Sequence, residues 1–144
     1  MFKQIVVAID GSEHGWQALE YAKYMAECEG ASLWLVHAFP HTSDLRGYES
    51  FDRLISERTE AGQVVLDEAR EQLGDTPLEV HEELLEGPPA EAILRVAEAR
   101  NADLIVMGTR GLAGIKHVLL GSVAERTLRL APCPVLTVKA SGEE

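Results

Sequence analysis

The sequence predicts an α/β fold with an open five-stranded parallel sheet and helices on both faces. Three observations lead to this fold class. Five short apolar runs alternate along the chain with longer segments of largely helical periodicity, which implies parallel strands joined by right-handed crossovers. The first run is continuously apolar, as in a strand buried on both faces. A length of 144 residues, 46% of them apolar, suits one domain with its own core.

The N-terminal part of the chain predicts a strand, a helix and a second strand. Residues 4–9 form the continuously apolar run, and residues 32–38 form the next one. Between them, residues 14–29 show helical spacing, and Gly30 is a suitable residue to end a helix. The residues at this spacing are Trp16, Leu19, Ala22, Tyr24 and Ala26.

The middle of the chain opens with its longest irregular stretch, residues 39–50. A helix is predicted over residues 51–73, because Gly74 and Pro77 break the pattern that follows. Its candidate inner positions are Leu54, Val64, Val65 and Leu66. Residues 78–84 alternate between apolar and polar, as expected of a half-exposed edge strand.

The C-terminal part predicts two more helices and two more strands. A helix over residues 90–100 follows Gly87-Pro88-Pro89, since proline is tolerated in the first turn of a helix. Residues 104–107 and 134–138 are the fourth and fifth strands, and a helix opens over Gly121–Leu130. One domain is expected over residues 1–140, and residues 141–144 are expected to form a flexible tail.

A glycine pattern near the C-terminus carries the strongest functional signal. It reads Gly108-Thr-Arg-Gly111, then nine residues, then Gly121-Ser122, between a strand and a helix start. Glycines let backbone N–H groups approach phosphates, and a helix N-terminus adds unpaired donors and a favourable dipole. The pattern is neither a Walker A loop nor the dinucleotide fingerprint. It indicates a nucleotide, and the alternative is an ordinary glycine-rich connection.

Asp10, at the end of the first strand, is the second candidate site residue. Ligands of open parallel sheets bind at the carboxyl ends of the strands, where the strand order reverses. If the first strand is central, its partner across the reversal is most simply the fourth, which brings Asp10 beside the glycine loop. A carboxylate there suits ribose hydroxyls or Mg²⁺, and its alternative role is in an Asp-Gly-Ser turn. The cations near the loop, which equally suit an exposed loop, are Arg110, Lys116 and His117.

Composition excludes several classes of function. The formal net charge of −11 argues against nucleic acid as a partner, because phosphate backbones require a basic footprint. No apolar run reaches transmembrane length and no signal peptide is recognised, so no membrane association and a cytoplasmic location are expected. Cys28 and Cys133 lack zinc spacing and are expected to be reduced thiols. No metal site is predicted from the histidines.

Five segments of the chain occur together in one known family. They are Val7-Ala-Ile-Asp-Gly-Ser12, Gly87-Pro-Pro-Ala-Glu-Ala-Ile93, Met107-Gly-Thr-Arg-Gly111, Leu120-Gly-Ser-Val-Ala-Glu125 and Ala131-Pro-Cys-Pro-Val-Leu-Thr-Val138. Taken together, they closely resemble the universal stress protein family over nearly the whole chain. The resemblance implies a Rossmann-like fold of the adenine nucleotide alpha hydrolase-like type. The complete glycine pattern marks the ATP-binding kind of this family.

The resemblance also implies a ligand and its contacts. The ligand would be ATP, or ADP or AMP, together with Mg²⁺. By resemblance, Gly108, Gly111, Gly121 and Ser122 would line the phosphates, and Asp10 would contact the ribose.

The remaining contacts implied by the resemblance concern the other end of the ligand. Ala8 and Ile9, together with Ala38 at the end of the second strand, would border the adenosine. Met107 and Val123 would flank the pocket.

The leading functional hypothesis is an ATP-binding regulatory or stress-response protein. Nucleotide occupancy would be its signal, and it would act on an unknown protein partner as a homodimer formed through residues 134–138, which the resemblance implies. The alternative is an enzyme, a slow ATP hydrolase or a nucleotidyl- or phosphotransferase, although the loop lacks a clear general base. A receiver switched by phosphorylation fits poorly, because only Asp10 stands at the end of the first strand. A structural dimer with an unused pocket stays open.

Overall fold

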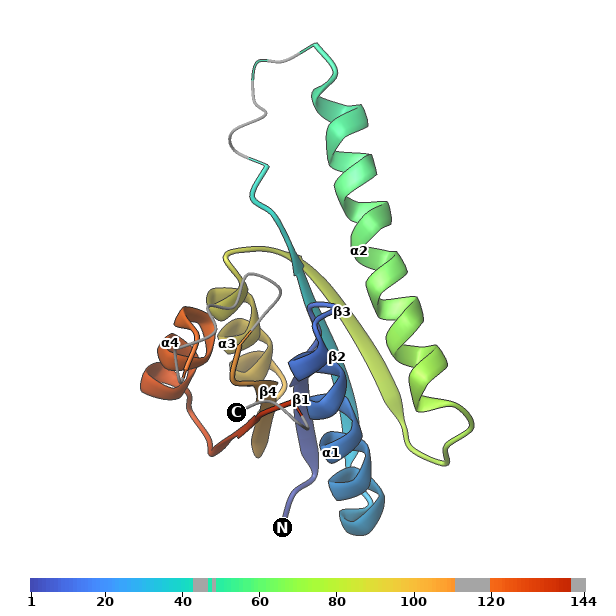
Figure 1. Ribbon diagram of the computed structural model, residues 1–144, viewed down its shortest axis with the longest axis vertical. Helices are drawn as coiled ribbons and strands as arrows, with labels where there is room; N and C mark the ends of the chain where they lie inside the picture. Colours follow the sequence, from blue (N-terminus) through green and yellow to red (C-terminus); the bar gives the residue numbers. More distant parts are fainter. Residues whose placement is uncertain (43–46, 48, 111–119, 141–144) are drawn as a thin grey trace.

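The computed structural model describes residues 1–42, 47, 49–110 and 120–140, and strands alternate with helices throughout these ranges (Figure 1). The elements are β1 (Gln4–Ala8), α1 (Glu13–Glu29), β2 (Ser32–Phe39), α2 (Phe51–Leu73), β3 (Val80–Glu86), α3 (Pro89–Ala99), β4 (Leu104–Gly108), α4 (Ser122–Leu130) and β5 (Val135–Val138). The predicted tail, residues 141–144, lies outside the described residues.

The five strands form one parallel sheet in the order β3-β2-β1-β4-β5. The predicted fold class is therefore confirmed, and β1 is central, with β2 on one side and β4 on the other. The strand order reverses between β1 and β4. The helices that follow these two strands, α1 and α4, lie on opposite faces of the sheet, and such sheets bind ligands at the carboxyl ends of the strands between them.

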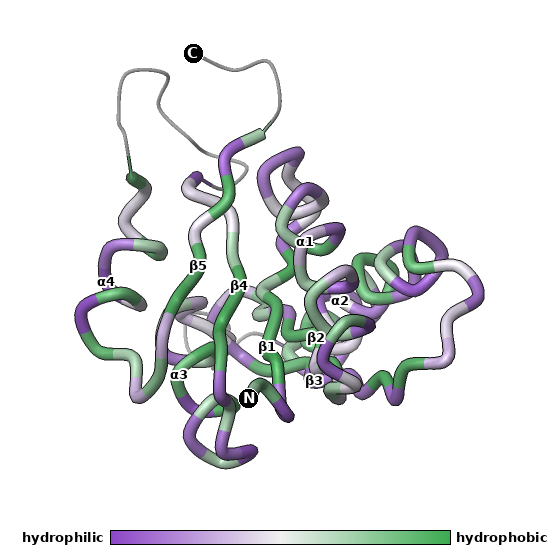
Figure 2. The backbone as a smooth tube through the Cα atoms, turned by 90° about the horizontal axis from the view of Figure 1, so that it is seen from below, coloured by the Kyte–Doolittle hydropathy of each residue, from purple (hydrophilic) through white to green (hydrophobic). Residues whose placement is uncertain are grey.

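Helices cover both faces of the sheet, α1 and α2 on one side and α3 and α4 on the other (Figure 1). Alternate residues of β1 point to opposite faces of the sheet. Ile5 and Val7 pack in the core under α1 and α2, whereas Val6 packs in the core under α3 and α4. This is the period of two expected of a strand. The apolar stretches of the chain accordingly run through the middle of the molecule (Figure 2).

Local signals explain where α1 and α3 begin and end. The Ser12 side chain caps α1 by accepting a hydrogen bond from the Gly15 N–H at 3.1 Å. Gly30 ends the helix with φ of 67°, a conformation that favours glycine. Pro89 stands in the first turn of α3, where a missing N–H costs nothing.

Three sequence expectations differ from the structure. β3 begins at Val80, two residues later than predicted, because Leu78 still belongs to a turn in which its N–H donates to Thr76 Oγ1 at 3.3 Å. Val64 is 53% exposed and Tyr24 is 69% exposed, so neither is an inner residue. Both lie off the buried stripe of their helix, which Leu66 marks in α2.

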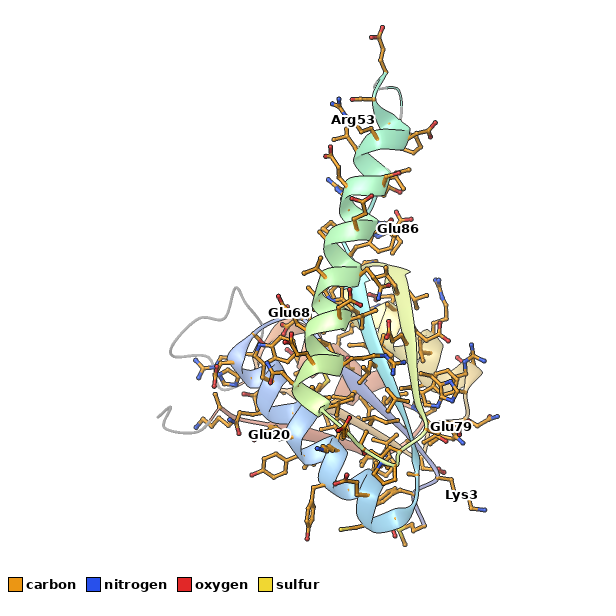
Figure 3. All side chains as sticks on the ribbon, turned by 90° about the vertical axis from the view of Figure 1, so that its right-hand side faces the viewer. Lys3, Glu20, Arg53, Glu68, Glu79 and Glu86 are labelled. Atoms are coloured by element: carbon orange, nitrogen blue, oxygen red, sulfur yellow. The ribbon has the colours of Figure 1, made fainter. Side chains whose placement is uncertain are left out.

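The long helix α2 also extends beyond the sheet. Its first turns project past the strands, and charged side chains such as Arg53 and Glu68 stand on its outer surface (Figure 3). Its C-terminal half carries the residues that reach the core, namely Leu66, Ala69 and Leu73. None of the described helices is long and apolar enough to span a bilayer.

Candidate functional site

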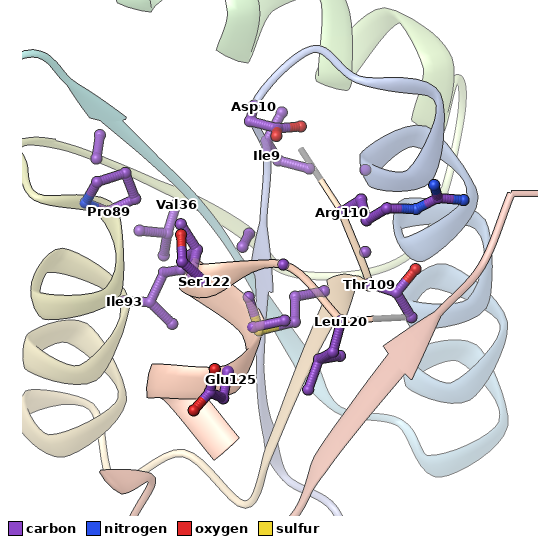
Figure 4. A pocket seen from close by; sticks show the side chains of 18 of the residues that line it. Ile9, Asp10, Val36, Pro89, Ile93, Thr109, Arg110, Leu120, Ser122 and Glu125 are labelled. Carbon is purple, nitrogen blue, oxygen red and sulfur yellow. The ribbon is translucent and has the colours of Figure 1, made fainter. Parts of the chain in front are cut away.

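A cavity of about 560 Å³ opens at the carboxyl ends of the strands, where β1 and β4 part. This volume is in the range of small-molecule sites. Residues from the ends of β1, β2 and β4 line it, together with the first turns of α3 and α4. In Figure 4, Val36, Pro89 and Ile93 lie on one side of the cavity, and Thr109 and Arg110 on the other.

The structure brings the predicted site residues that it describes around this one cavity. They are Ala8, Ile9, Asp10, Ala38, Met107, Gly108, Gly121, Ser122 and Val123. The remaining one, Gly111, lies outside the described residues, as do Lys116 and His117. The topological argument therefore placed Asp10 and the glycine segment correctly at one edge of the sheet.

Sequence reasoning missed part of the lining. The additional residues are Gly15, Val36, His37, Pro89, Ile93, Thr109, Leu120, Ala124 and Glu125. A signal for two of them was present, because Pro89 and Ile93 belong to a segment that follows the edge strand directly. Val36 and His37 directly precede Ala38 in the second strand. The position of the strand end alone does not determine which of the three residues faces a ligand.

One end of the cavity is apolar. Val36, Ile93 and Met107, all buried, belong to the core beneath α3 and α4 and also line the cavity. The backbone of β2 passes beyond the end of β1 here: the Ile9 N–H donates to the Val36 carbonyl at 2.8 Å, and β2 continues to Phe39. This end suits a flat apolar group bordered by an exposed strand edge.

The other end of the cavity is formed by backbone at the start of α4. The Gly121 N–H donates to the Thr109 carbonyl at 2.6 Å, which holds the two arms of the glycine segment together. Gly121 is the N-cap of α4, and no side chain of the described residues caps this helix. The first N–H groups of α4 are therefore donors available to an anion.

Two glycines at the site are required by close packing. A Cβ atom on Gly108 would lie 2.6 Å from His14 Cβ, and one on Gly15 would lie 2.7 Å from Asp10 Oδ1. The first turn of α1 thus rests directly against both the glycine segment and Asp10. A side chain at either position would force these parts of the cavity wall apart.

Asp10 has the turn role considered for it and also lies at the cavity. Its Oδ1 accepts hydrogen bonds from the Ser12 N–H at 2.9 Å and from Ser12 Oγ at 2.5 Å, so the carboxylate orders the turn before α1. The same residue lines the cavity. A carboxylate held in this way is oriented in advance for a hydroxyl or a cation.

Charged groups flank the cavity without filling it. Arg110 lines it and is only 6% exposed. Glu125 also lines it and pairs with Arg129 one turn later. Glu91 of α3 pairs with Arg126 of α4, and this hydrogen bond holds the pKa of the Glu91 carboxyl below its usual value. The pair joins the two helices whose first turns form the wall.

Two histidines, His14 and His37, serve the framework of the site. His37 Nδ1 lies 2.6 Å from the Ile9 carbonyl oxygen and donates to it, which ties β2 to the end of β1. His14 is buried against Gly108. Over the ranges that the structure describes, no three side chains of the metal-binding types gather into a metal site.

Comparison with known proteins gives a consistent result. Residues 1–139 match the sequence profile of the Universal stress protein family. A universal stress protein of Thermus aquaticus, encoded in the QAH/OAS sulfhydrylase 3′ region, is 44% identical over 139 residues, which cover 96% of this chain and all of that protein.

Solved structures agree with this match. The protein MJ0577 of Methanocaldococcus jannaschii has a TM-score of 0.87 at 29% identity, covering 96% of each chain. A universal stress protein solved in complex with cAMP has a TM-score of 0.74 at 30% identity, covering 97% of this chain and 99% of that one.

Proposed function

Because the chain belongs to the universal stress protein family, we propose that it is an ATP-binding regulatory protein whose nucleotide occupancy is its signal. One observation carries this proposal: the cavity at the strand-order reversal joins an apolar end to a glycine-rich helix start. An adenine nucleotide has the same division, a flat base at one end and phosphates at the other. The expected cytoplasmic location stays a prediction.

The apolar end is the proposed adenosine subsite. The Val36 carbonyl faces β1, because it accepts a hydrogen bond from the Ile9 N–H. Residues two apart in a strand direct their backbone groups to the same edge, so the N–H and C=O of Ala38 also point toward the β1 side of β2. β1 has already ended at this level. One donor beside one acceptor matches the N1 acceptor and N6 donor of adenine, whereas guanine presents the opposite pair.

The glycine segment is the proposed phosphate subsite. Gly108 and Gly121 line the cavity without a side chain, and Ser122 opens α4 with a hydroxyl and an N–H. Asp10 is placed to accept hydrogen bonds from ribose hydroxyls, or to hold Mg²⁺ that the phosphates also bind. The acidic chain requires such local donors, because its net charge is −11.

The relative solved with cAMP supports an adenine nucleotide, since this chain is 30% identical to it over nearly its whole length. cAMP shares adenine, ribose and one phosphate with ATP. The triphosphate is proposed here because Arg110, a cation, lines the same cavity as Gly121 and Ser122 and suits the greater negative charge of three phosphates.

We also propose that the protein forms a homodimer through β5. β5 is an edge of the sheet, and its sequence, Val135–Val138, is mostly apolar. α4 leads into it with two exposed leucines, Leu128 at 45% and Leu130 at 51%. An unpaired apolar edge is a ready template for pairing with a second copy.

Titration calorimetry tests the proposed nucleotide site. The wild-type protein is expected to bind MgATP in the micromolar range and GTP at least about tenfold more weakly, because guanine mismatches the edge of β2. Gly121→Val is expected to abolish binding, since a Cβ there already lies 3.2 Å from the Thr109 carbonyl. The matched control, Ala61→Val on the exposed surface of α2, should bind as the wild type does. Equal affinity for all three proteins would exclude the site.

A further inference from the structure

His14 lies between the glycine segment and the end of the chain that follows β5. It is in the first turn of α1 and is 6% exposed. Its Nδ1 lies 3.0 Å from Thr109 Oγ1 and 3.2 Å from the backbone nitrogen of Ala140. One ring nitrogen therefore joins two segments that are remote from α1 in sequence.

The hydrogen-bond partners of His14 Nδ1 determine which ring nitrogen carries the proton. The backbone N–H of Ala140 can only donate, so His14 Nδ1 must be an acceptor. The Thr109 hydroxyl, which can rotate, then donates to the same nitrogen, and the two donors share its single lone pair. It follows that the ring is neutral and carries its proton on Nε2.

Thr109 also forms backbone hydrogen bonds with β5 and with the start of α4. Its N–H donates to the Val138 carbonyl at 2.9 Å, and its own carbonyl accepts from the Gly121 N–H at 2.6 Å. Gly108, next to it, packs against the backbone and Cβ of His14. A continuous set of hydrogen bonds thus runs from Ala140 through His14 and Thr109 to the N-cap of α4.

We propose that His14 is a positioning residue that sets the phosphate subsite through the acceptor function of its Nδ1. The proposal rests on the function proposed above and assigns that subsite a support outside the glycine pattern. The ring holds Thr109, Thr109 holds Gly121, and Gly121 starts the helix whose N–H groups face the phosphates. The adenosine end, formed by Ala38 and Val36, has no bond in this set.

Two isosteric substitutions separate the acceptor from the packing. His14→Asn places Oδ1 where Nδ1 stands, whereas His14→Leu has the same branched shape without an acceptor. We expect His14→Leu to weaken ATP binding about fivefold or more and to leave adenosine binding within about twofold of wild type. His14→Asn should restore ATP binding to within about twofold. Equal ATP affinity of the Leu and Asn variants would overturn the proposal.

A second measurement needs no nucleotide. In the ligand-free protein, amide hydrogen exchange of Ala140 and Gly121 should be about fivefold or more faster in His14→Leu and near wild type in His14→Asn. Thr109→Val, which removes only the hydroxyl, should speed exchange at Gly121 in the same direction. Unchanged exchange in both His14→Leu and Thr109→Val would overturn the proposal even if ATP binds.

ATP binding and amide exchange together distinguish a failure of the proposed nucleotide site from a failure of the proposed role of His14. If the wild-type protein binds no nucleotide, the proposed function fails, and exchange at Ala140 and Gly121 still decides whether His14 holds this segment. Long-range ¹H–¹⁵N correlation of the imidazole gives an independent check. An Nε2–H tautomer is expected, and an Nδ1–H tautomer would contradict the proposal.

Discussion

Asp10 takes the turn role that sequence analysis considered for it, and its position leaves the proposed ligand role open to test. Its Oδ1 orders the Asp-Gly-Ser turn through Ser12, and the turn in turn directs the residue toward the cavity. The left-handed φ of 83° at Gly11 permits this tight turn. A carboxylate that orders a turn can therefore also line a cavity, because the turn positions it.

Replacing Asp10 by asparagine separates these roles. Asn keeps an oxygen that can accept from Ser12, so the turn and the Tm should be preserved. It loses the charge, and hydrogen bonds from ribose hydroxyls or contact with Mg²⁺ should weaken. We expect MgATP affinity about tenfold lower, measured by calorimetry.

The control for this prediction is Asp10→Ala, which should lower both the Tm and the affinity. If Asp10→Asn binds MgATP as tightly as the wild type, the carboxylate is a turn residue and not a ligand contact.

At the same scale, residues with remote partners were not predictable. Gly108, Gly121 and Asp10 carry local signals, since glycine spacing and a strand end can be read directly. The role of His14 depends on Thr109, which is 95 residues away in sequence. Nothing in the residues around His14 indicates that partner, so only the assembled fold shows it.

Among the elements, the errors arose from small uncertainties in helical phase. Tyr24 is mostly exposed because it stands five residues after Leu19 and two before Ala26, and neither interval is the three or four residues that keep side chains on one face of α1. Val64 stands two residues before Leu66 and faces outward, since successive residues of a helix point about 100° apart and these two therefore lie on nearly opposite faces. Apolar composition locates a helix correctly but does not determine which of two neighbouring positions faces the core.

Asp103 predicts a pH dependence at the level of the strands. Its Oδ2 accepts from the N–H groups of Lys3 at 2.7 Å and Gln4 at 2.8 Å, which anchors the start of β1 beside β4. These backbone hydrogen bonds hold the pKa of the Asp103 carboxyl below its ordinary value of 3.8. Because the folded-state pKa is lowered, the ionised carboxylate stabilises the fold at pH values above 3.8. This contribution is lost as the pH falls through the folded-state pKa.

Asp103→Asn should therefore lower the Tm by about 3 °C near neutral pH, and the difference should close in acid, below pH 3.8. Thermal denaturation of both proteins across this range measures it. A difference that is the same at neutral and acid pH would show that ionisation of Asp103 contributes nothing.

For the whole molecule, the position of the cavity followed from the order of the strands. A continuously apolar first strand indicated a central β1, and the glycine segment after the fourth strand indicated its neighbour across the reversal. The strand order alone does not place Pro89 and Ile93 in the cavity wall, although their segment follows the edge strand directly. Their place in the wall depends on how the α3 crossover packs onto the sheet, which sequence periodicity does not define.

The proposed dimer gives a prediction at this scale. The Ile105 N–H donates to the Pro134 carbonyl and the Thr109 N–H to the Val138 carbonyl, so even-numbered residues of β5 face β4. The N–H of Thr137 then points to the free edge. Thr137→Pro removes this donor without removing a bond to β4, and we expect it to yield a monomer by light scattering.

The matching control is Thr137→Val, which keeps the N–H and should remain dimeric. A wild-type protein that is monomeric at all concentrations would contradict the proposed interface. A Thr137→Pro variant that stays dimeric would show that the copies meet elsewhere.

The measurement that tests the central claim most directly is a ¹H–¹⁵N NMR titration of the whole protein with MgATP. The claim predicts saturable shifts at the amides of Ala38, Gly108, Gly121 and Ser122, which line the two ends of the cavity. Amides of α2 such as Ala61, outside the cavity, should stay unchanged. Absence of any shift, or shifts confined to residues away from the β1–β4 reversal, would contradict an adenine nucleotide site there.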